Sequence, residues 1–237
     1  MNPLNTVYLV PSLLDENALE TIPVYIIDTI KNCQVIFAEN ERSTRRYLKK
    51  IYPEISIDNF EWFTIHKKEN EQVGVFREKI KEGKNIAIIS EAGCPGVADP
   101  GQLLVKAAYE LNVRVRPLVG PSSVLLALMA SGMSGQQFRF VGYLPIELKE
   151  KTTRIRELED ESGRKKCTEI FIETPYRNNQ LIETLLNVCR PSTLLCIASE
   201  LTSKNEFITT MSVLEWKKLK IDMHKKPAIF LLFANIN

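Results

Sequence analysis

The stretch that decides the fold is "NIAIISEAGCPGVADPGQLLVKAAYELN", residues 85–112. A short apolar run is followed by a loop, residues 91–101, that holds three glycines and two prolines, and then by a helical pattern. A buried strand, a loop and a helix in this order are typical of α/β sheets, which commonly bind ligands beyond the carboxyl ends of their strands. Because Gly93 and Gly96 carry no Cβ, the loop either allows a ligand close to its backbone or simply turns tightly into the helix.

Two helix starts are written into the sequence. Asp99 is placed to cap the helix after the loop, with Pro100 at its first position, and we favour this role over that of an acid–base group. The stretch "GPSSVLLALMASGM", residues 120–133, repeats the arrangement, with Ser122 or Ser123 near the helix start and Gly132 at its end.

The order of apolar runs predicts an α/β protein with two lobes. Up to residue 119, short β-branched or apolar runs alternate with helical patterns, which indicates a mostly parallel sheet. Beyond residue 145 the strands lie closer together in the sequence and fewer helices separate them, which indicates a second lobe with a mixed sheet. We expect the lobes to comprise residues 1–117 and 118–237.

Composition excludes several classes of protein. The 237 residues are 44% hydrophobic and 25% charged, as in ordinary globular chains. No apolar run reaches the ~18 residues that span a bilayer, and residues 1–16 lack the basic start of a signal peptide, so we expect a cytoplasmic protein. Five scattered cysteines argue against a disulfide framework, and two histidines, His66 and His224, argue against a zinc enzyme.

Charge gives only local support for nucleic-acid binding. The formal net charge of +2 is too small to attract a polyanion as a whole. Residues 41–50, "ERSTRRYLKK", gather basic side chains on one side of a predicted helix: Arg42, Arg45, Arg46, Lys49 and Lys50. This cluster is either a solvated helix face or a track for phosphate groups.

Five ordered motifs carry a resemblance to a known family. They are "SEAGCPGVADPG" (90–101), "GPSSVLLALMASGM" (120–133), "FVGYLP" (140–145), "IFIETPYR" (170–177) and "ASELTSKNE" (198–206). None is a dinucleotide-binding G-x-G-x-x-G or a nucleoside-triphosphate P-loop. In order and spacing they resemble the tetrapyrrole-methylase superfamily of S-adenosylmethionine-dependent methyltransferases. The chain is most similar to the bacterial branch that methylates a cytidine ribose 2′-hydroxyl of 16S ribosomal RNA.

This resemblance implies a cofactor, a fold and a set of binding residues. The fold would be a pair of α/β lobes with S-adenosylmethionine in the cleft between them, in a homodimer that needs no metal. Cofactor contacts carried over from the family fall on Pro11, Ala92, Gly93, Cys94, Val97, Ser122, Ser123, Glu173, Leu201 and Ala228.

The reaction that the resemblance implies needs a group that takes a proton from a weak nucleophile, the ribose hydroxyl. Glu39, Glu91, Glu173 and Glu200 each stand where a strand gives way to a loop, and each is either this base or a carboxylate that fixes its loop. Tyr176 and Arg177 either contact a nucleotide of the substrate or fix the start of the following helix.

Two other functions stay open at this point. Within the same superfamily the substrate could be a tetrapyrrole carbon, for which arginines facing propionate groups in a wide apolar cleft would be expected. A protein that binds S-adenosylmethionine without turnover is the other alternative, because "VPSLLDENALET", residues 10–21, departs from the usual "TPIGN" of the RNA-modifying branch.

Overall fold

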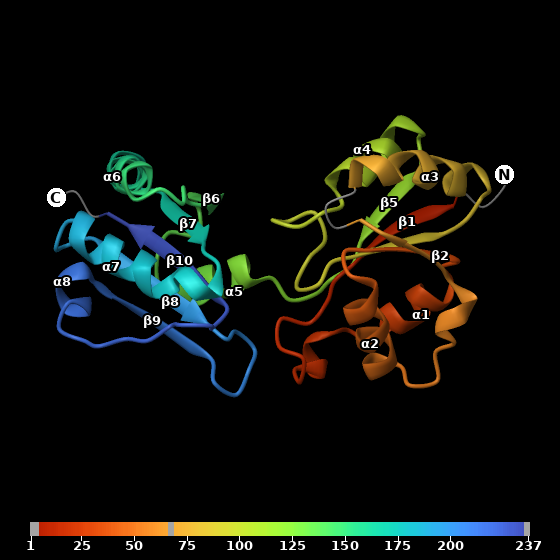
Figure 1. Ribbon diagram of the computed structural model, residues 1–237, viewed down its shortest axis with the longest axis horizontal. Helices are drawn as coiled ribbons and strands as arrows, with labels where there is room; N and C mark the ends of the chain where they lie inside the picture. The colour runs from red at the N-terminus through yellow and green to blue at the C-terminus, as the bar shows by residue number, and fades with distance from the viewer. Residues whose placement is uncertain (1–4, 66–68, 235–237) are drawn as a thin grey trace. The chain divides into compact units, whose positions relative to one another are not determined.

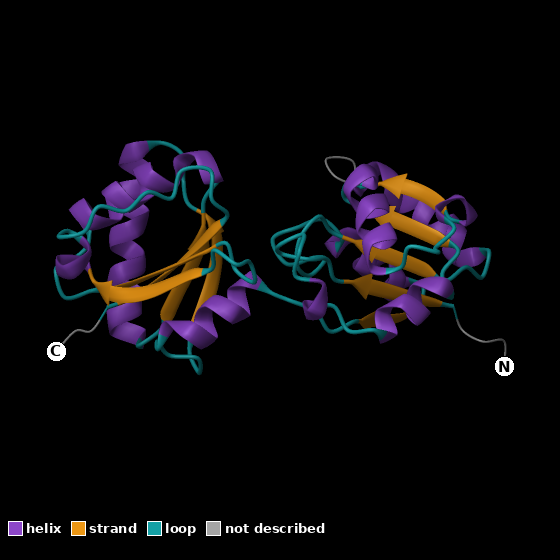
Figure 2. Ribbon diagram, turned by 90° about the horizontal axis from the view of Figure 1, so that it is seen from below, coloured by secondary structure: helices purple, strands orange, loops and turns teal. Residues whose placement is uncertain are grey.

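The computed structural model describes residues 5–65 and 69–234, so that His66 lies outside the described residues. The chain divides into two compact units, Met1–Ser122 and Ser123–Asn237. Each unit contains one five-stranded sheet with helices packed beside it (Figures 1 and 2). The predicted α/β class, with one parallel and one mixed sheet, is confirmed.

The sheet of the first unit is parallel throughout, with strand order β3-β2-β4-β1-β5. Parallel neighbours need crossover connections, and the helices between the strands supply them. The elements are β1 (Thr6–Val10), η1 (Leu19–Thr21), α1 (Tyr25–Lys31), β2 (Val35–Ala38), α2 (Glu41–Ile51), η2 (Ile57–Asn59), β3 (Glu61–Thr64), α3 (Glu69–Lys81), β4 (Ile86–Ile89), α4 (Gln102–Glu110) and β5 (Arg114–Pro117), where η marks a short 3-10 helix.

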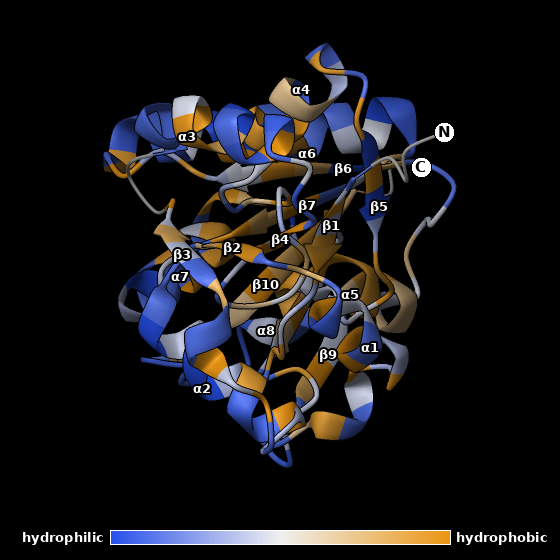
Figure 3. Cartoon of the chain, turned by 90° about the vertical axis from the view of Figure 1, so that its right-hand side faces the viewer, coloured by the Kyte–Doolittle hydropathy of each residue, from blue (hydrophilic) through white to orange (hydrophobic). Residues whose placement is uncertain are grey.

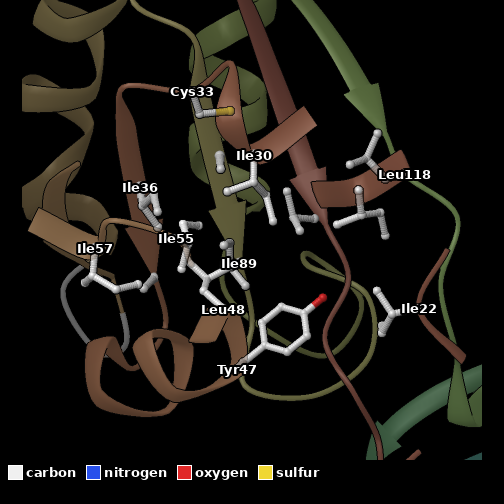
Figure 4. Close-up of a cluster of buried hydrophobic side chains, with 14 of the residues drawn as sticks. Ile22, Ile30, Cys33, Ile36, Tyr47, Leu48, Ile55, Ile57, Ile89 and Leu118 are labelled. Carbon is white, nitrogen blue, oxygen red and sulfur yellow. The ribbon is translucent and has the colours of Figure 1, made fainter. Parts of the chain in front are cut away.

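Side chains of the central strands alternate between two apolar cores. On β4, Ile89 belongs to the core that includes Ile30 of α1 and Leu48 of α2 (Figure 4), whereas Ile88 belongs to the core with Phe76 of α3. This is the two-residue period of a strand whose two faces are both covered. Figure 1 accordingly shows α1 and α2 on one face of this sheet and α3 and α4 on the other.

The sheet of the second unit is mixed, with strand order β6-β7-β10-β8-β9. Strands β6 and β7 are parallel, and the other neighbours are antiparallel. The elements are α5 (Ser123–Ser131), β6 (Phe138–Tyr143), α6 (Leu148–Lys165), β7 (Thr168–Ile172), η3 (Pro175–Arg177), α7 (Asn178–Val188), β8 (Leu194–Ser199), β9 (Phe207–Ser212), α8 (Val213–Trp216) and β10 (Ala228–Phe233).

The core of the second unit lies between its sheet and helices α6, α7 and α8. Phe171 of β7 and Phe230 of β10 stack at its centre, and Trp216 of α8 donates Nε1–H to the carbonyl of Leu195 at 2.8 Å. Helix α5 packs against β9 and β10. In Figure 3 the central strands β4 and β10 are hydrophobic, whereas the helix α2 is mostly hydrophilic, as expected for buried strands under surface helices.

One local prediction is wrong, and one strand was not predicted. Helix α4 begins at Gln102 after Gly101, whose φ is 131°, and not at Asp99 and Pro100. Its first amides are satisfied from a distance, because Glu69 Oε1 accepts hydrogen bonds from the N–H groups of Gly101 and Leu103 at 3.0 and 2.8 Å. The sequence also gives no sign of strand β3, since it is a short edge strand with exposed ends. Gly132 does end α5, with a φ of 70°.

Candidate functional site

In the first unit, the glycine-rich loop and the loop after β1 are tied together at one edge of the sheet. Ser12 N–H donates to the carbonyl of Gly93 at 2.8 Å, and Gly93 N–H donates to the carbonyl of Ser12 at 3.2 Å. The Ser12 hydroxyl also donates to the carbonyl of Ser90 at 2.8 Å. Gly93 has a φ of 68°, which side chains rarely adopt, so a glycine suits the turn. This pairing places Pro11, which precedes Ser12, near the glycine-rich loop.

A third loop of the first unit, which contains Gly120 and Pro121, contacts the glycine-rich loop. The Cys94 thiol donates to the carbonyl of Pro121 at 3.5 Å, so that residues of "GPSS" lie against the glycine-rich loop. A Cβ built on Gly120 would overlap the ring of Pro11, so only glycine allows this approach. Of the predicted cofactor residues, Pro11, Gly93 and Cys94 are therefore gathered in one place, and Ala92 and Val97 belong to the same loop.

Two carboxylates of the first unit, Glu39 and Glu91, follow the carboxyl ends of β2 and β4, and a third, Asp99, is close enough to feel their charges. Glu39 Oε2 accepts from the N–H of Glu91 at 2.9 Å, and Glu91 Oε1 accepts from the Ser43 hydroxyl at 2.9 Å. Both glutamates therefore fix their loops. They also line an open pocket of about 400 Å³, together with Asn40, Glu41, Arg42 and Thr64.

Asp99 is the third carboxylate of this group, for which the sequence favoured helix capping over an acid–base role. Burial, followed by the negative charges of Glu39 and Glu91, raises its pKa from 3.8 to about 7. A carboxylate with a pKa near neutrality is able to accept and release a proton under physiological conditions. The signal that could have found it is its place in the same loop as the glycines, but its neighbourhood with Glu39 arises only from the fold.

In the second unit, the predicted residues meet at one edge of the mixed sheet. Strand β10 runs antiparallel to β7 and β8, with Ile229 opposite Ile172 and Ala228 opposite Ser199. The start of β10 therefore lies beside the ends of β7 and β8. This register gathers Glu173, Glu200, Leu201 and Ala228, and Glu200 N–H donates to the carbonyl of Pro227 at 2.9 Å.

Glu173 is held by several groups within its own unit. Its Oε1 accepts from Arg177 Nε at 2.9 Å and from the N–H of Thr174 at 2.7 Å, and its Oε2 lies 3.5 Å from Lys151 Nζ. The side chains of Glu173 and Lys151 are each 1% exposed. This arrangement favours the structural alternative for Arg177, whereas Tyr176 is 70% exposed.

The basic cluster on α2 is only partly free to meet a phosphate. Arg45 donates Nε–H to Glu41 Oε1 at 2.8 Å, lies 3.7 Å from Asp58 Oδ1 and stacks 4.7 Å from the centre of the Trp62 ring. Arg42 and Arg46 stand on the same helix as Arg45. These contacts favour the helix-face alternative for Arg45.

The cysteine in the glycine-rich loop has no sign of an activated thiol. Burial, followed by the charge of Asp99, raises the pKa of Cys94 above its ordinary value.

Among the described residues, no group of three or more His, Cys, Asp or Glu side chains is arranged to hold a metal ion. Within residues 5–65 and 69–234 we also find no helix that combines the length and apolar composition needed to cross a bilayer.

Comparison with known proteins decides the family. The family model described as Tetrapyrrole (Corrin/Porphyrin) Methylases matches residues 17–215. The chain belongs to this family. A tetrapyrrole-methylase family member of this kind is an S-adenosylmethionine-dependent methyltransferase, which confirms the predicted enzyme class and cofactor.

Three curated relatives of this family member share one name, Ribosomal RNA small subunit methyltransferase I. The protein from Buchnera aphidicola subsp. Schizaphis graminum is 32% identical over 98% of this chain and 80% of its own length. The Bacillus subtilis protein is 32% identical over 90% of this chain and 70% of its own. The Escherichia coli O157:H7 protein is 31% identical over 98% and 78%.

Solved structures agree on the fold of the family. The crystal structure of the methyltransferase CobJ matches with a TM-score of 0.65 and 16% identity, covering 98% of this chain and 94% of its own. The cobalt precorrin-4 methyltransferase CbiF matches with a TM-score of 0.60 and 16% identity, covering 96% and 94%. At this identity the likeness concerns the fold alone.

The sheet edge of the second unit fits a polar ligand such as S-adenosylmethionine. In the part of the chain that the structure describes, two buried side-chain atoms at this edge, Ser199 Oγ and Thr202 Oγ1, have no hydrogen-bond partner, and Glu173 Oε2 has an ion-pair contact with Lys151 but no hydrogen bond. Buried polar atoms are almost always paired in folded proteins. A ligand that carries amino, carboxylate and hydroxyl groups would satisfy them, so the residues present are compatible with the family's cofactor.

Proposed function

We propose that this protein methylates small-subunit ribosomal RNA, at a ribose 2′-hydroxyl of a cytidine. The observation that carries the proposal is the shared name of relatives that align with 90% or more of the chain at about 30% identity. The tetrapyrrole alternative has only the structural likeness, at 16% identity, in its support. A protein with this substrate works where ribosomal subunits mature, so we place it in the cytoplasm.

We assign cofactor contacts in each unit by itself. In the first unit we assign this role to the main chain around Ala92, Gly93, Cys94 and Val97, with Pro11 and Ser122 beside it. In the second unit we assign it to Ser123, Glu173, Leu201 and Ala228. When bound, S-adenosylmethionine supplies an electrophilic methyl group. The glycine-rich loop would admit it because side chains are missing there.

Asp99 is the group that we assign to accept the proton of the ribose hydroxyl. Glu39 and Glu91 are engaged in fixing their loops, and Glu173 is engaged by Arg177 and Lys151. Glu200 lies 3.8 Å from Lys226 Nζ. Asp99 differs from these in holding its proton up to about pH 7, which suits a base that must be regenerated at neutral pH.

Calorimetry on a loop variant tests the cofactor assignment. Gly93→Val would fill the site but would also strain the backbone, because Gly93 has a φ of 68°. A loss of affinity in this variant would therefore have two causes. Ala92→Trp avoids that strain and places a large side chain over the loop, so we expect at least a tenfold loss of S-adenosylmethionine affinity. Val24→Trp, at a residue that is 78% exposed on another loop, is the matched control. An unchanged affinity in Ala92→Trp would remove the loop from the site.

A further inference from the structure

A basic segment, residues 217–226, stands out among the features that the proposed site does not use. It reads "KKLKIDMHKK" and contains five lysines and one aspartate. Lys217, Lys218, Lys220 and Lys225 are exposed, as is His224. Residues 41–50 on α2 have the same balance of five basic residues and one acidic residue, but there Arg45 is engaged by Glu41 and the neighbouring pocket is lined by Glu39 and Glu91.

The segment comes directly after α8 and forms neither helix nor strand, but hydrogen bonds hold it in place. Asn179 accepts from the N–H of Met223 at 2.8 Å and donates to Asp222 Oδ1 at 2.8 Å. Asn178 donates Nδ2–H to the carbonyl of Lys226 at 2.7 Å, and Lys225 N–H donates to the carbonyl of Pro175 at 3.0 Å. The positive charges are therefore presented by an ordered backbone, which reduces the entropy lost on binding.

An exposed aromatic ring stands within this positive surface. The ring of Tyr176 is 6.0 Å from that of His224, at an angle of 75°, and Lys225 Nζ is 6.0 Å from its centre. Tyr176 is 70% exposed, so much of its side chain is accessible to a partner. An exposed aromatic ring surrounded by cations is the combination with which proteins bind unpaired nucleotides: the ring stacks on a base and the cations meet the phosphates.

We propose that Tyr176 and the basic segment form the surface that holds the single-stranded RNA around the methylated nucleotide. The segment leads directly into Ala228, at the sheet edge that we assign to the cofactor, and Pro227 accepts from the N–H of Glu200 there. This inference rests on the proposed function and names the region of the chain that receives its RNA. Recognition of an unpaired strand follows, because a duplex hides the faces of its bases.

RNA-binding measurements at several salt concentrations test this surface, with an unpaired RNA of about ten nucleotides and a duplex of the same length as probes. The wild type is expected to prefer the unpaired strand. Tyr176→Ala is expected to lose about tenfold or more of this affinity, and Tyr176→Phe to retain it. The quadruple variant Lys217→Ala, Lys218→Ala, Lys220→Ala and Lys225→Asn should lower the salt slope by roughly 0.7 for each phosphate that it no longer neutralises.

Asparagine is chosen at position 225 because Lys225 has a φ of 61°, which asparagine tolerates. A matched control removes four exposed lysines elsewhere, Lys81, Lys106, Lys149 and Lys165, and is expected to keep the wild-type slope. Unfolding midpoints of all variants report whether each one is folded.

Equal salt slopes for the two quadruple variants, or full affinity in Tyr176→Ala, would overturn the inference. It would also be overturned if the basic-segment variant bound naked RNA normally but no longer bound the small ribosomal subunit, since the segment would then meet a ribosomal protein. Failure of the proposed function looks different, because the wild type itself would then transfer no methyl group to ribosomal RNA.

Discussion

The ammonium group of Lys151 lies 3.5 Å from Oε2 of Glu173, and both side chains are 1% exposed. Lys151 stands in the first turns of α6 and Glu173 directly after β7, so the pair joins the helix to the sheet edge that we assign to the cofactor. Removing Lys151 takes the ion-pair partner from the buried Glu173 Oε2, although Arg177 still engages Oε1, and a buried carboxylate that loses a partner is costly.

We therefore expect Lys151→Met to lower the free energy of unfolding by ~3 to 5 kcal/mol, as measured by urea denaturation. The double variant Lys151→Met with Glu173→Gln should recover part of this loss, because it removes both charges. Lys149→Met, at an exposed lysine of the same helix, is the control and should change stability little. A decrease below ~1 kcal/mol in Lys151→Met would show that the pair is not a buried ion pair.

Glu69 caps α4 from a distance, so its replacement should act on that helix. Glu69→Ala leaves the N–H groups of Gly101 and Leu103 without their acceptor, and we expect a decrease of ~0.5 to 2 kcal/mol in the free energy of unfolding. Glu69→Gln keeps an oxygen acceptor and should have a smaller effect. Glu78→Ala, at an exposed glutamate of α3, is the control. Equal stability of the Glu69→Ala and Glu78→Ala proteins would contradict the cap.

Asp99 gives two pH dependences. The folded state holds its proton more tightly than the unfolded chain does, because its pKa is raised from 3.8 to about 7. Its contribution to stability is therefore present below about pH 4 and is lost as the pH rises to about 7. We expect Asp99→Asn to be more stable than the wild type at about pH 8, with the difference shrinking toward about pH 4 in urea denaturation.

If Asp99 is also the base, kcat/KM of the wild type should rise with pH and level off above about pH 7. Asp99→Asn should lower methyl transfer ~100-fold or more and abolish this rise. A variant that keeps the wild-type rate and profile would assign the base elsewhere, whatever its stability.

The predicted homodimer has a candidate surface on α5. Leu125 and Met129 of this helix are 52% and 80% exposed, and exposed apolar side chains of this size commonly mark contact surfaces. Light scattering at micromolar concentration should give twice the mass of one chain, 27.1 kDa, for the wild type. Leu125→Glu with Met129→Glu should give the mass of one chain. A wild-type mass near 27.1 kDa would exclude the dimer.

Much of the fold follows from local patterns, since the apolar runs that form β1 and β10 are largely buried and therefore easily recognised as strands. Edge strand β3 was not predicted because only part of it is buried. The start of α4 was predicted wrongly because its cap comes from Glu69, 32 residues away in the chain. The site shows the same limit. The glycines and motifs are visible in the sequence, whereas the raised pKa of Asp99 and the enclosure of Glu173 depend on groups that only the fold brings together.

Methyl transfer to ribosomal RNA tests the central claim most directly. Purified protein is incubated with S-adenosylmethionine labelled in its methyl group and with small ribosomal subunits from cells in which this gene has been deleted, with Ala92→Trp as the control. We predict that the wild type labels the RNA and that the labelled linkage resists alkaline hydrolysis, because a methylated 2′-hydroxyl cannot attack the neighbouring phosphate. Tight cofactor binding without any label in the RNA would contradict the account.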